Sequence, residues 1–314
     1  MKRSSTTSWR PTGDLASLRA RAELLSQIRA YFASEQVMEV ETPLASASTV
    51  TDPYLEAFQV DGKYLQTSPE YAMKRLLAAG CGDIYQIAKA FRQEESGRYH
   101  NPEFTLLEWY RLNFSLEQMF AEIDSLLQLT LGTASIQIAR YPDLFEEHLA
   151  IDTHTISDRE LIETVRQQCG GLELTDRDDC LTTLFASIIE PRIGVELPCI
   201  VSHFPAAQAS LARLDAEDPR LARRFEVYFK GVELANGFHE LTDADEQAMR
   251  FAVDNQKRRD SNKPEKPIDQ MLLNALRAGL PDCVGVALGI DRLLMLKLGK
   301  GHISDVLSFD STNA

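Results

Sequence analysis

The chain has 314 residues, enough for one large domain or two small ones, and its 33 basic and 47 acidic side chains give a net charge of −14. Nucleic-acid binding depends on Lys and Arg that neutralise phosphates, so this charge disfavours a wide nucleic-acid surface and favours a cationic protein partner. The five cysteines are scattered and contain no CxxC pair, which predicts neither a disulfide framework nor a zinc site and favours the cytoplasm. The sequence has no apolar run of about 18 residues and a polar start, so we expect no transmembrane helix and no signal peptide.

The first 130 residues predict two helices and two longer strands. In chain order, we expect a helix over 14–36, a short strand over 37–41, strands over 84–94 and 103–111, and an amphipathic helix over 115–130. Asp14 can cap the first helix, and Pro43 ends the short strand. Ser115 and Gln118 can form a capping box at the start of the amphipathic helix.

The region 112–220 is mostly helical in pattern, and we interpret it as an insertion packed on the sheet. The elements expected towards the C-terminus are strands over 198–204 and 223–235, helices over 243–259 and 268–278, a buried strand over 283–290 and a helix over 291–298.

Arg92 and Glu94 are the first candidate ligand-binding residues. Side chains alternate along a strand, so both share a face with the small Ala88 and Ala90, which suits a flat ligand. The planar fork of Arg92 can hold an α-phosphate, and Glu94 can accept a hydrogen bond from an adenine amine. A surface ion pair on an edge strand is the alternative.

Glu108 and Tyr110 share a face of the next strand. A carboxylate beside a phenol suits an ammonium group, because a buried carboxylate that loses its charged partner costs roughly 3–5 kcal/mol. An ion pair between Glu108 and Arg111 or Arg98 is the alternative.

Three glutamates, Glu226, Glu233 and Glu240, flank a turn signal. Asn236-Gly237 predicts a two-residue hairpin, which would place Glu233 opposite Glu240. Facing carboxylates repel each other, so a cation is expected beside them. A bulge at Gly231 would bring Glu226 to the same site. Converging carboxylates indicate Mg²⁺ or a substrate ammonium, and solvated glutamates are the alternative.

The run from Gly285 to Arg292 predicts a strand that leads into a helix. Gly289 leaves room for a ligand against the backbone. Arg292 lies in the first helical turn, where the helix dipole favours anions, so it can hold a γ-phosphate. Ser68-Pro69-Glu70, by its pattern alone, is a helix start.

These stretches resemble known motifs. The runs 91–104 and 107–111 are similar to motif 2 of class II aminoacyl-tRNA synthetases, 285–292 is similar to motif 3, and the helix, strand and proline at 14–43 are similar to motif 1, which builds a dimer interface. The resemblance is closest to the lysyl-tRNA synthetase catalytic domain. It implies an α+β fold, in which helices flank an antiparallel sheet.

The resemblance also implies roles for individual residues. It implies catalytic roles for Arg92 and Arg292, and ATP contacts for Arg92, Gln93, Glu94, Asn101, Glu233, Leu234, Gly289 and Arg292. It implies substrate contacts for Ser68, Pro69, Glu70, Glu108, Tyr110, Glu240 and Ala287. Mg²⁺ is expected at Glu226 and Glu233.

The resemblance covers residues 14–309 and leaves no room for an N-terminal OB-fold anticodon domain, so 1–314 is expected to be a single catalytic domain. This pattern, and the runs 99–105, 233–243 and 285–289, resemble the elongation factor P–lysine ligases, which are truncated lysyl-tRNA synthetase paralogues. Ala287 replaces the glycine usual in lysyl-tRNA synthetases, and we expect it to help set a preference for (R)-β-lysine. Gln93 departs from the family's asparagine, with no expected effect.

The function implied is ATP-dependent activation of (R)-β-lysine or α-lysine as an adenylate, with Mg²⁺, and transfer to a lysine ε-amine of elongation factor P. A homodimer without stable tRNA binding is expected. The alternatives are a minimal lysyl-tRNA synthetase that charges tRNA, and a non-catalytic paralogue that only binds an amino acid.

Overall fold

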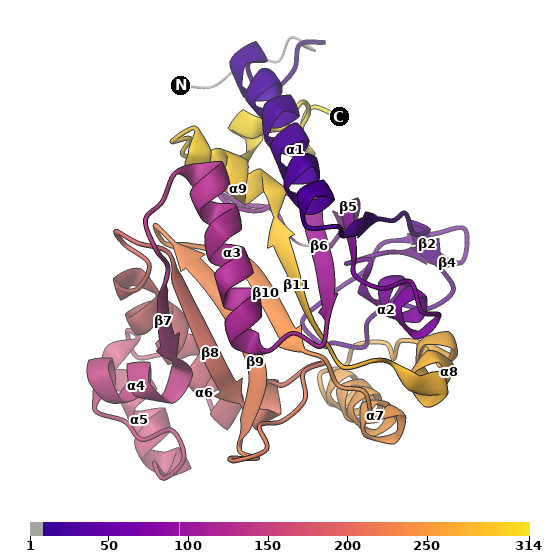
Figure 1. The fold of residues 1–314 in the computed structure, drawn as a ribbon. Helices are drawn as coiled ribbons and strands as arrows, with labels where there is room; N and C mark the ends of the chain where they lie inside the picture. Colours follow the sequence, from indigo (N-terminus) through magenta and orange to yellow (C-terminus); the bar gives the residue numbers. More distant parts are fainter. Residues whose placement is uncertain (1–8, 94) are drawn as a thin grey trace.

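An eight-stranded sheet in the order β1-β5-β6-β11-β10-β9-β8-β7 organises the computed structural model, which describes residues 9–93 and 95–314 (Figure 1). Across the sheet, the strands are β1 (Met38–Glu39), β5 (Ile84–Phe91), β6 (Glu103–Leu112), β11 (Cys283–Gly289), β10 (Val232–His239), β9 (Leu221–Phe229), β8 (Cys199–Pro205) and β7 (Gln137–Arg140). All pairs from β5 to β8 are antiparallel, whereas the outer strands β1 and β7 pair in parallel. The expected α+β class and antiparallel sheet are therefore confirmed, with parallel edges.

One face of this sheet is covered by α1 (Leu15–Ser34), α3 (Leu116–Leu131) and α9 (Ile290–Lys297). Figure 1 shows α3 crossing the near face of the sheet, with α1 and α9 above it. Local sequence signals start these helices: the Asp14 side chain accepts from the Ser17 N–H at 2.7 Å, and Ser115 forms its capping box with Gln118. Both predicted caps are confirmed.

A second group of helices, α2 (Glu70–Ala78), α7 (Ala244–Asp260) and α8 (Gln270–Gly279), packs beside the other face around Met73, Leu77 and Leu272. A small sheet, β2-β4-β3, adjoins α2 in Figure 1 and is formed by Ala45–Ser46, Lys63–Leu65 and Gln59–Val60. None of the helices in the described residues combines the length and apolarity that a membrane span requires. All five cysteines are free.

The region 112–220 is only partly the helical insertion that was expected. Its helices α4 (Tyr141–Leu149), α5 (Asp158–Gln168) and α6 (Arg177–Leu184) enclose a core of their own with β8, and α6 continues into a π-helix over Phe185–Ile189. However, β7 and β8 join the main sheet, and α3 packs with α1 and α9. Three short 3₁₀ helices cover Glu190–Arg192, Ala206–Gln208 and Ile303–Val306.

The hairpin predicted at Asn236-Gly237 is wrong. The chain turns instead at Lys230-Gly231, whose φ angles of 51° and 70° are the two left-handed values that a type I′ turn needs, so the expected strand over 223–235 is two strands. Gly237 lies inside β10, where a Cβ would come within 2.2 Å of the Phe225 ring. Its glycine is required by packing and not by a turn.

Candidate functional site

The register of the central strands places a row of chemically distinct side chains on one sheet face. Across β6, β11, β10 and β9, Glu108 pairs with Ala287, Ala287 with Asn236, and Asn236 with Glu226. Adjacent positions on the same face are Tyr110 and the three small residues Gly285, Ala287 and Gly289 of β11. Short side chains in the middle of the row and long ones at its sides leave a cavity of about 230 Å³, lined by residues of this row.

Gly285 allows the tightest approach in this cavity. A Cβ at this position would lie 2.3 Å from Tyr110 Cε1 and 2.5 Å from Glu240 Oε1, so only glycine lets these two side chains meet over β11. At Gly289 a Cβ would find its nearest neighbour, Arg292 Cδ, at an ordinary 3.6 Å. Gly289 lines the cavity, and a methyl there would only touch the Arg292 side chain.

Glu108 lies at the end of the cavity that can bind an amine. It accepts hydrogen bonds from Ser68 Oγ at 2.6 Å and from the Tyr110 hydroxyl at 2.7 Å. Burial, and then the neighbouring Glu70, raise the pKa of Glu108 to about 7. The ion pair considered for Glu108 does not form, because Arg111 contacts Glu122, Asp83 and Glu35, and Arg98 donates to the Gly301 carbonyl.

Lys74 is a residue of this region that sequence reasoning missed. Its ammonium lies 2.7 Å from Glu70 Oε1 and 2.6 Å from Glu240 Oε2. A cation was expected beside the carboxylates of Glu233 and Glu240. Lys74 lies beside Glu240 alone. Burial raises the pKa of Glu240 to about 8, and the Lys74 ammonium opposes this rise. The i,i+4 spacing of Glu70 and Lys74 was the only sequence signal for it.

Arg92 and Arg292 line the same cavity. Arg92 follows β5, which ends at Phe91 and is shorter than expected, but the Arg92 N–H still donates to the Pro102 carbonyl at 2.9 Å. Its side chain lies over the Phe104 ring at 5.0 Å and contacts Glu95 at 3.3 Å. It remains 27% exposed, so its charge is accessible from the cavity.

Arg292 is held by backbone and ring acceptors, and its Nη1 lies 3.6 Å from Glu233 Oε2. It donates to the carbonyl oxygens of Glu233 at 2.8 Å and Tyr99 at 3.2 Å, and lies 2.6 Å from His100 Nε2. Burial and the charge of Arg292 lower the pKa of His100, so the imidazole is neutral and accepts. The preceding Asp291 accepts from Arg21 Nη1 of α1 and from the Thr105 N–H, each at 2.7 Å, which fixes the start of α9.

Glu226 and Glu233 share a second cavity of about 420 Å³, which adjoins the first. The hairpin turn brings them to one face, because Glu233 pairs with Tyr228; the bulge expected at Gly231 lies instead between Glu233 and Ala235. Glu226 accepts hydrogen bonds from Arg224 and from the Tyr228 hydroxyl. Glu240 lies at the amine end, so the three glutamates do not converge.

A preformed metal centre is not found in the described part of the chain, where no three His, Cys, Asp or Glu side chains form a metal-binding group. The chemistry of Glu226 and Glu233 nevertheless fits Mg²⁺, which is typically bound by one or two carboxylates together with substrate phosphates and water.

The remaining candidates divide by position. Ser68, Glu70, Asn101 and Leu234 line the first cavity, whereas Pro69 and Gln93 do not. Asn101 uses its amide internally: Nδ2 donates to the Glu103 carbonyl at 2.6 Å, and Oδ1 accepts from the Ser311 N–H at 3.0 Å. Glu94, expected to contact adenine, lies outside the described residues.

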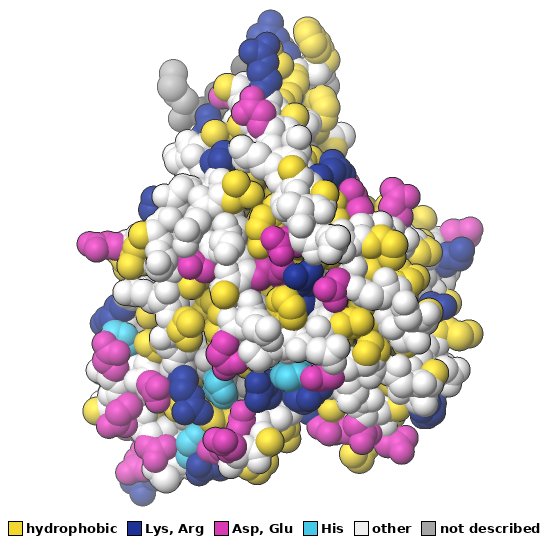
Figure 2. Space-filling view, in the orientation of Figure 1, with side chains coloured by type: hydrophobic (Ala, Val, Ile, Leu, Met, Phe, Trp, Pro, Cys, Tyr) yellow, Lys and Arg dark blue, Asp and Glu magenta, His cyan; other side chains and the backbone are white. Residues whose placement is uncertain are grey.

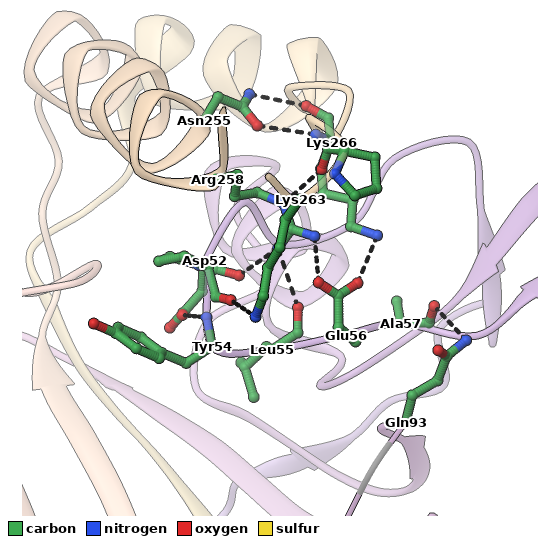
Figure 3. Close-up of polar contacts among 12 residues, drawn as sticks. Asp52, Tyr54, Leu55, Glu56, Ala57, Gln93, Asn255, Arg258, Lys263 and Lys266 are labelled. Carbon is green, nitrogen blue, oxygen red and sulfur yellow. Dashed lines mark hydrogen bonds and ion pairs between the residues drawn. The ribbon is translucent and has the colours of Figure 1, made fainter. Parts of the chain in front are cut away.

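A loop over residues 50–57, called the roof loop below, covers the cavity and contributes Val50, Thr51, Asp52 and Leu55 to its lining. Figure 3 shows how it is held. The fully buried Arg258 of α7 forms an ion pair with Glu56 and donates to the Asp52 carbonyl at 2.9 Å. Lys266 contacts the other Glu56 oxygen at 2.9 Å, and Lys263 donates to the Pro53 carbonyl at 2.7 Å.

The roof loop is also joined to the strand that presents Arg92. The Gln93 N–H donates to the Glu56 carbonyl at 2.8 Å. Its side-chain amide donates to the Ala57 carbonyl at 3.2 Å, as Figure 3 shows. Gln93 therefore has a structural role here, because its two hydrogen bonds join the segment that carries Arg92 to the roof loop.

Comparisons with known proteins identify the family of the chain. The model of the family "tRNA synthetases class II (D, K and N)" matches residues 5–313. The elongation factor P–(R)-β-lysine ligase of Salmonella dublin is 49% identical over 98% of both chains. That of Pectobacterium carotovorum subsp. carotovorum (strain PC1) is 49% identical over 99% of this chain and all of the relative. The chain thus belongs to the class II aminoacyl-tRNA synthetase family, in the branch of the elongation factor P–(R)-β-lysine ligases.

Proposed function

We propose that this protein is an ATP-dependent ligase that activates (R)-β-lysine or α-lysine as an adenylate and transfers it to a lysine ε-amine of elongation factor P. The observation that carries the proposal is that one cavity is lined both by Glu70, Glu108 and Glu240, which contact Lys74 or Tyr110, and by Arg92 and Arg292. Carboxyls suit the ammonium groups of a lysine, and arginines suit phosphates. The names of the relatives supply the acceptor.

Substrate recognition follows from this division. Glu108, with Tyr110 and Ser68 fixing its orientation, receives one ammonium group, and Glu240 and Glu70 receive the other. The substrate carboxylate then lies over β11, where Ala287 forms the floor and Arg92 is accessible. Gly289 leaves space for the nucleotide beside it.

In the first half-reaction, an oxygen of the substrate carboxylate attacks the α-phosphorus of ATP. An acyl–phosphate bond forms, the bond to the β-phosphate oxygen breaks, and pyrophosphate leaves. Arg92 stabilises the charge that develops at the α-phosphate, and Arg292 holds the γ-phosphate. Mg²⁺ held by Glu226 and Glu233 would neutralise phosphate charge when bound.

In the second half-reaction, the ε-amine of the acceptor lysine attacks the adenylate carbonyl. The new amide bond forms, the carbon–oxygen bond to AMP breaks, and the amine loses a proton. The chain needs no nucleophile of its own, since the acyl group passes directly from AMP to the acceptor. The role of the protein is to position and to stabilise charge.

We further propose that the working form is a homodimer in the cytoplasm, built on α1 and β1. Leu15 of α1 and Met38 of β1 are 68% and 46% exposed, so apolar surface is available on both elements. Figure 2 shows hydrophobic side chains on the projection formed by α1, together with basic and acidic ones. The net charge of −14 disfavours stable tRNA binding.

The test is a pair of assays on purified protein. ATP–pyrophosphate exchange with (R)-β-lysine and α-lysine measures adenylate formation, and acyl transfer is then compared between elongation factor P and lysine tRNA. Arg92→Lys keeps the charge but removes the fork and should abolish most exchange, whereas Lys89→Met, at an exposed position of β5 three residues earlier, should not. Transfer to tRNA alone would indicate a minimal synthetase, and lysine binding without exchange a non-catalytic paralogue.

A further inference from the structure

Lys74 is a buried cation behind the amine end of the cavity. Its side chain is 1% exposed, and it contacts Glu70 across one turn of α2 and Glu240 across the space to the end of β10. Both carboxylates line the cavity, but Lys74 does not. It therefore holds the two acids from the protein side and leaves their other faces to a ligand.

The charges at this end do not balance. Glu70, Glu108 and Glu240 supply three carboxyls, and among the ion pairs of the described residues Lys74 is the one cation that contacts any of them. Glu108 has only the neutral donors Ser68 and Tyr110. With all three acids ionised, the group has an excess of two negative charges. Buried charge without a partner is unfavourable, so the group favours two added positive charges.

We propose that Lys74 is a positioning residue that orients Glu70 and Glu240 and fixes this excess at two, so that the cavity selects amino acids with two ammonium groups. The inference rests on the proposed function, in which the substrate carboxylate is directed to Arg92. Both α-lysine and β-lysine then present two ammonium groups to the three acids. An amino acid with one amine leaves one carboxyl that must keep its proton.

The pH dependence of binding reports this arrangement. The groups that face Glu240 are Glu70 and Lys74 of α2, Glu108 and Tyr110 of β6, Cys283 of β11, and Arg213, whose Nε donates to the Glu240 carbonyl oxygen. Lys74 lowers the pKa of both Glu240 and Glu108, against the larger effect of burial. Removal of its charge must therefore raise both pKa values, so that the ionised group forms only at higher pH.

The experiment compares Lys74→Met and Lys74→Gln with Arg75→Met, which removes the exposed cation next to Lys74 on the same helix. We measure kcat/KM for lysine in ATP–pyrophosphate exchange as a function of pH, together with thermal unfolding. Both Lys74 variants should raise the lysine KM about tenfold or more and move the acid limb of the profile to higher pH by about one unit. A purely structural residue would lower activity without moving the limb. Arg75→Met should leave the lysine KM and the acid limb unchanged.

A measurement on the unmodified protein makes the test independent of variant stability. Calorimetry in two buffers without ATP gives the protons released when lysine, or norleucine, which lacks the ε-amine, binds. Lysine should release more protons, and norleucine should bind about tenfold more weakly or not at all. Equal release, or an unmoved acid limb in a folded Lys74 variant, overturns the proposal. Lysine binding without lysine-dependent exchange would refute the proposed function and leave the role of Lys74 standing.

Discussion

Gly285→Ala offers a sharp test of where the amine group binds. The added methyl would lie 2.3 Å from Tyr110 Cε1, so the ring must withdraw by about 0.7 Å to reach 3.0 Å, below which real Cβ contacts essentially do not occur. Glu240 Oε1, at 2.5 Å, must move as well. Misplacement of about 1 Å near the reacting groups can cost about 100-fold in rate, and overpacking about 1–3 kcal/mol in stability. We expect kcat/KM for lysine to fall about 100-fold.

Gly237→Ala is the control for overpacking, because its methyl meets Phe225 Cζ at 2.2 Å and the Gly285 carbonyl oxygen at 2.7 Å, on the core side of the sheet. It should lower the free energy of unfolding by a similar amount, measured in urea, but leave the lysine KM of the folded fraction near that of the wild type. Gly289→Ala meets no close atom and should mainly raise the KM for ATP. A Gly285→Ala protein with an unchanged lysine KM would refute the placement of the amine beside Tyr110 and Glu240.

Four further changes test other parts of the site. Arg292→Lys loses the fork that reaches two carbonyl oxygens at 2.8 and 3.2 Å, so the KM for ATP in the exchange assay should rise; an unchanged value would contradict γ-phosphate binding. Ala287→Gly should change the ratio of β-lysine to α-lysine activation by about 10- to 200-fold, since one carbon is worth about 1–3 kcal/mol, and an unchanged ratio would exclude it as a determinant. Arg258→Met removes one of the two cations that pair with Glu56, together with the donor to the Asp52 carbonyl, and should destabilise the protein by about 1–3 kcal/mol in urea unfolding; no measurable loss would contradict a fixed roof loop. The pKa values of Glu108 and Glu240 are raised to about 7 and about 8, so the protein without lysine should lose stability as pH rises from about 4.5 to 8. The affinity for lysine should increase over the same range. Melting temperatures with and without lysine that change in parallel with pH would contradict both assignments.

Local signals in the sequence were sufficient for most elements of the fold. The caps at Asp14 and Ser115 depend on contacts three residues apart, so the sequence alone could locate both helix starts. The failed hairpin at Asn236-Gly237 shows the limit. The dipeptide is a strong local turn signal, but the Phe225 ring, from the neighbouring strand, is the reason for the glycine.

The candidate site could be predicted where strand alternation determines which side chains share a face. Glu108 and Tyr110 are two residues apart on one strand, so the sequence predicts that their side chains share a face, where they form a hydrogen bond. The contact between Lys74 and Glu240 joins a helix to a strand more than 160 residues later, and no local pattern encodes it. The expected meeting of Glu226, Glu233 and Glu240 failed because the position of the turn decides which glutamates face each other.

In the proposed homodimer, the contact between Arg21 and Asp291 would connect the interface to the start of α9. Arg21 belongs to α1, on which we propose that the dimer is built, and Asp291 directly precedes Arg292. A rotation of α1 within the interface would therefore displace the guanidinium that holds the far end of the nucleotide. Occupancy of one protomer would alter affinity in the other, and ATP binding would be cooperative in the dimer and hyperbolic in dilute monomers.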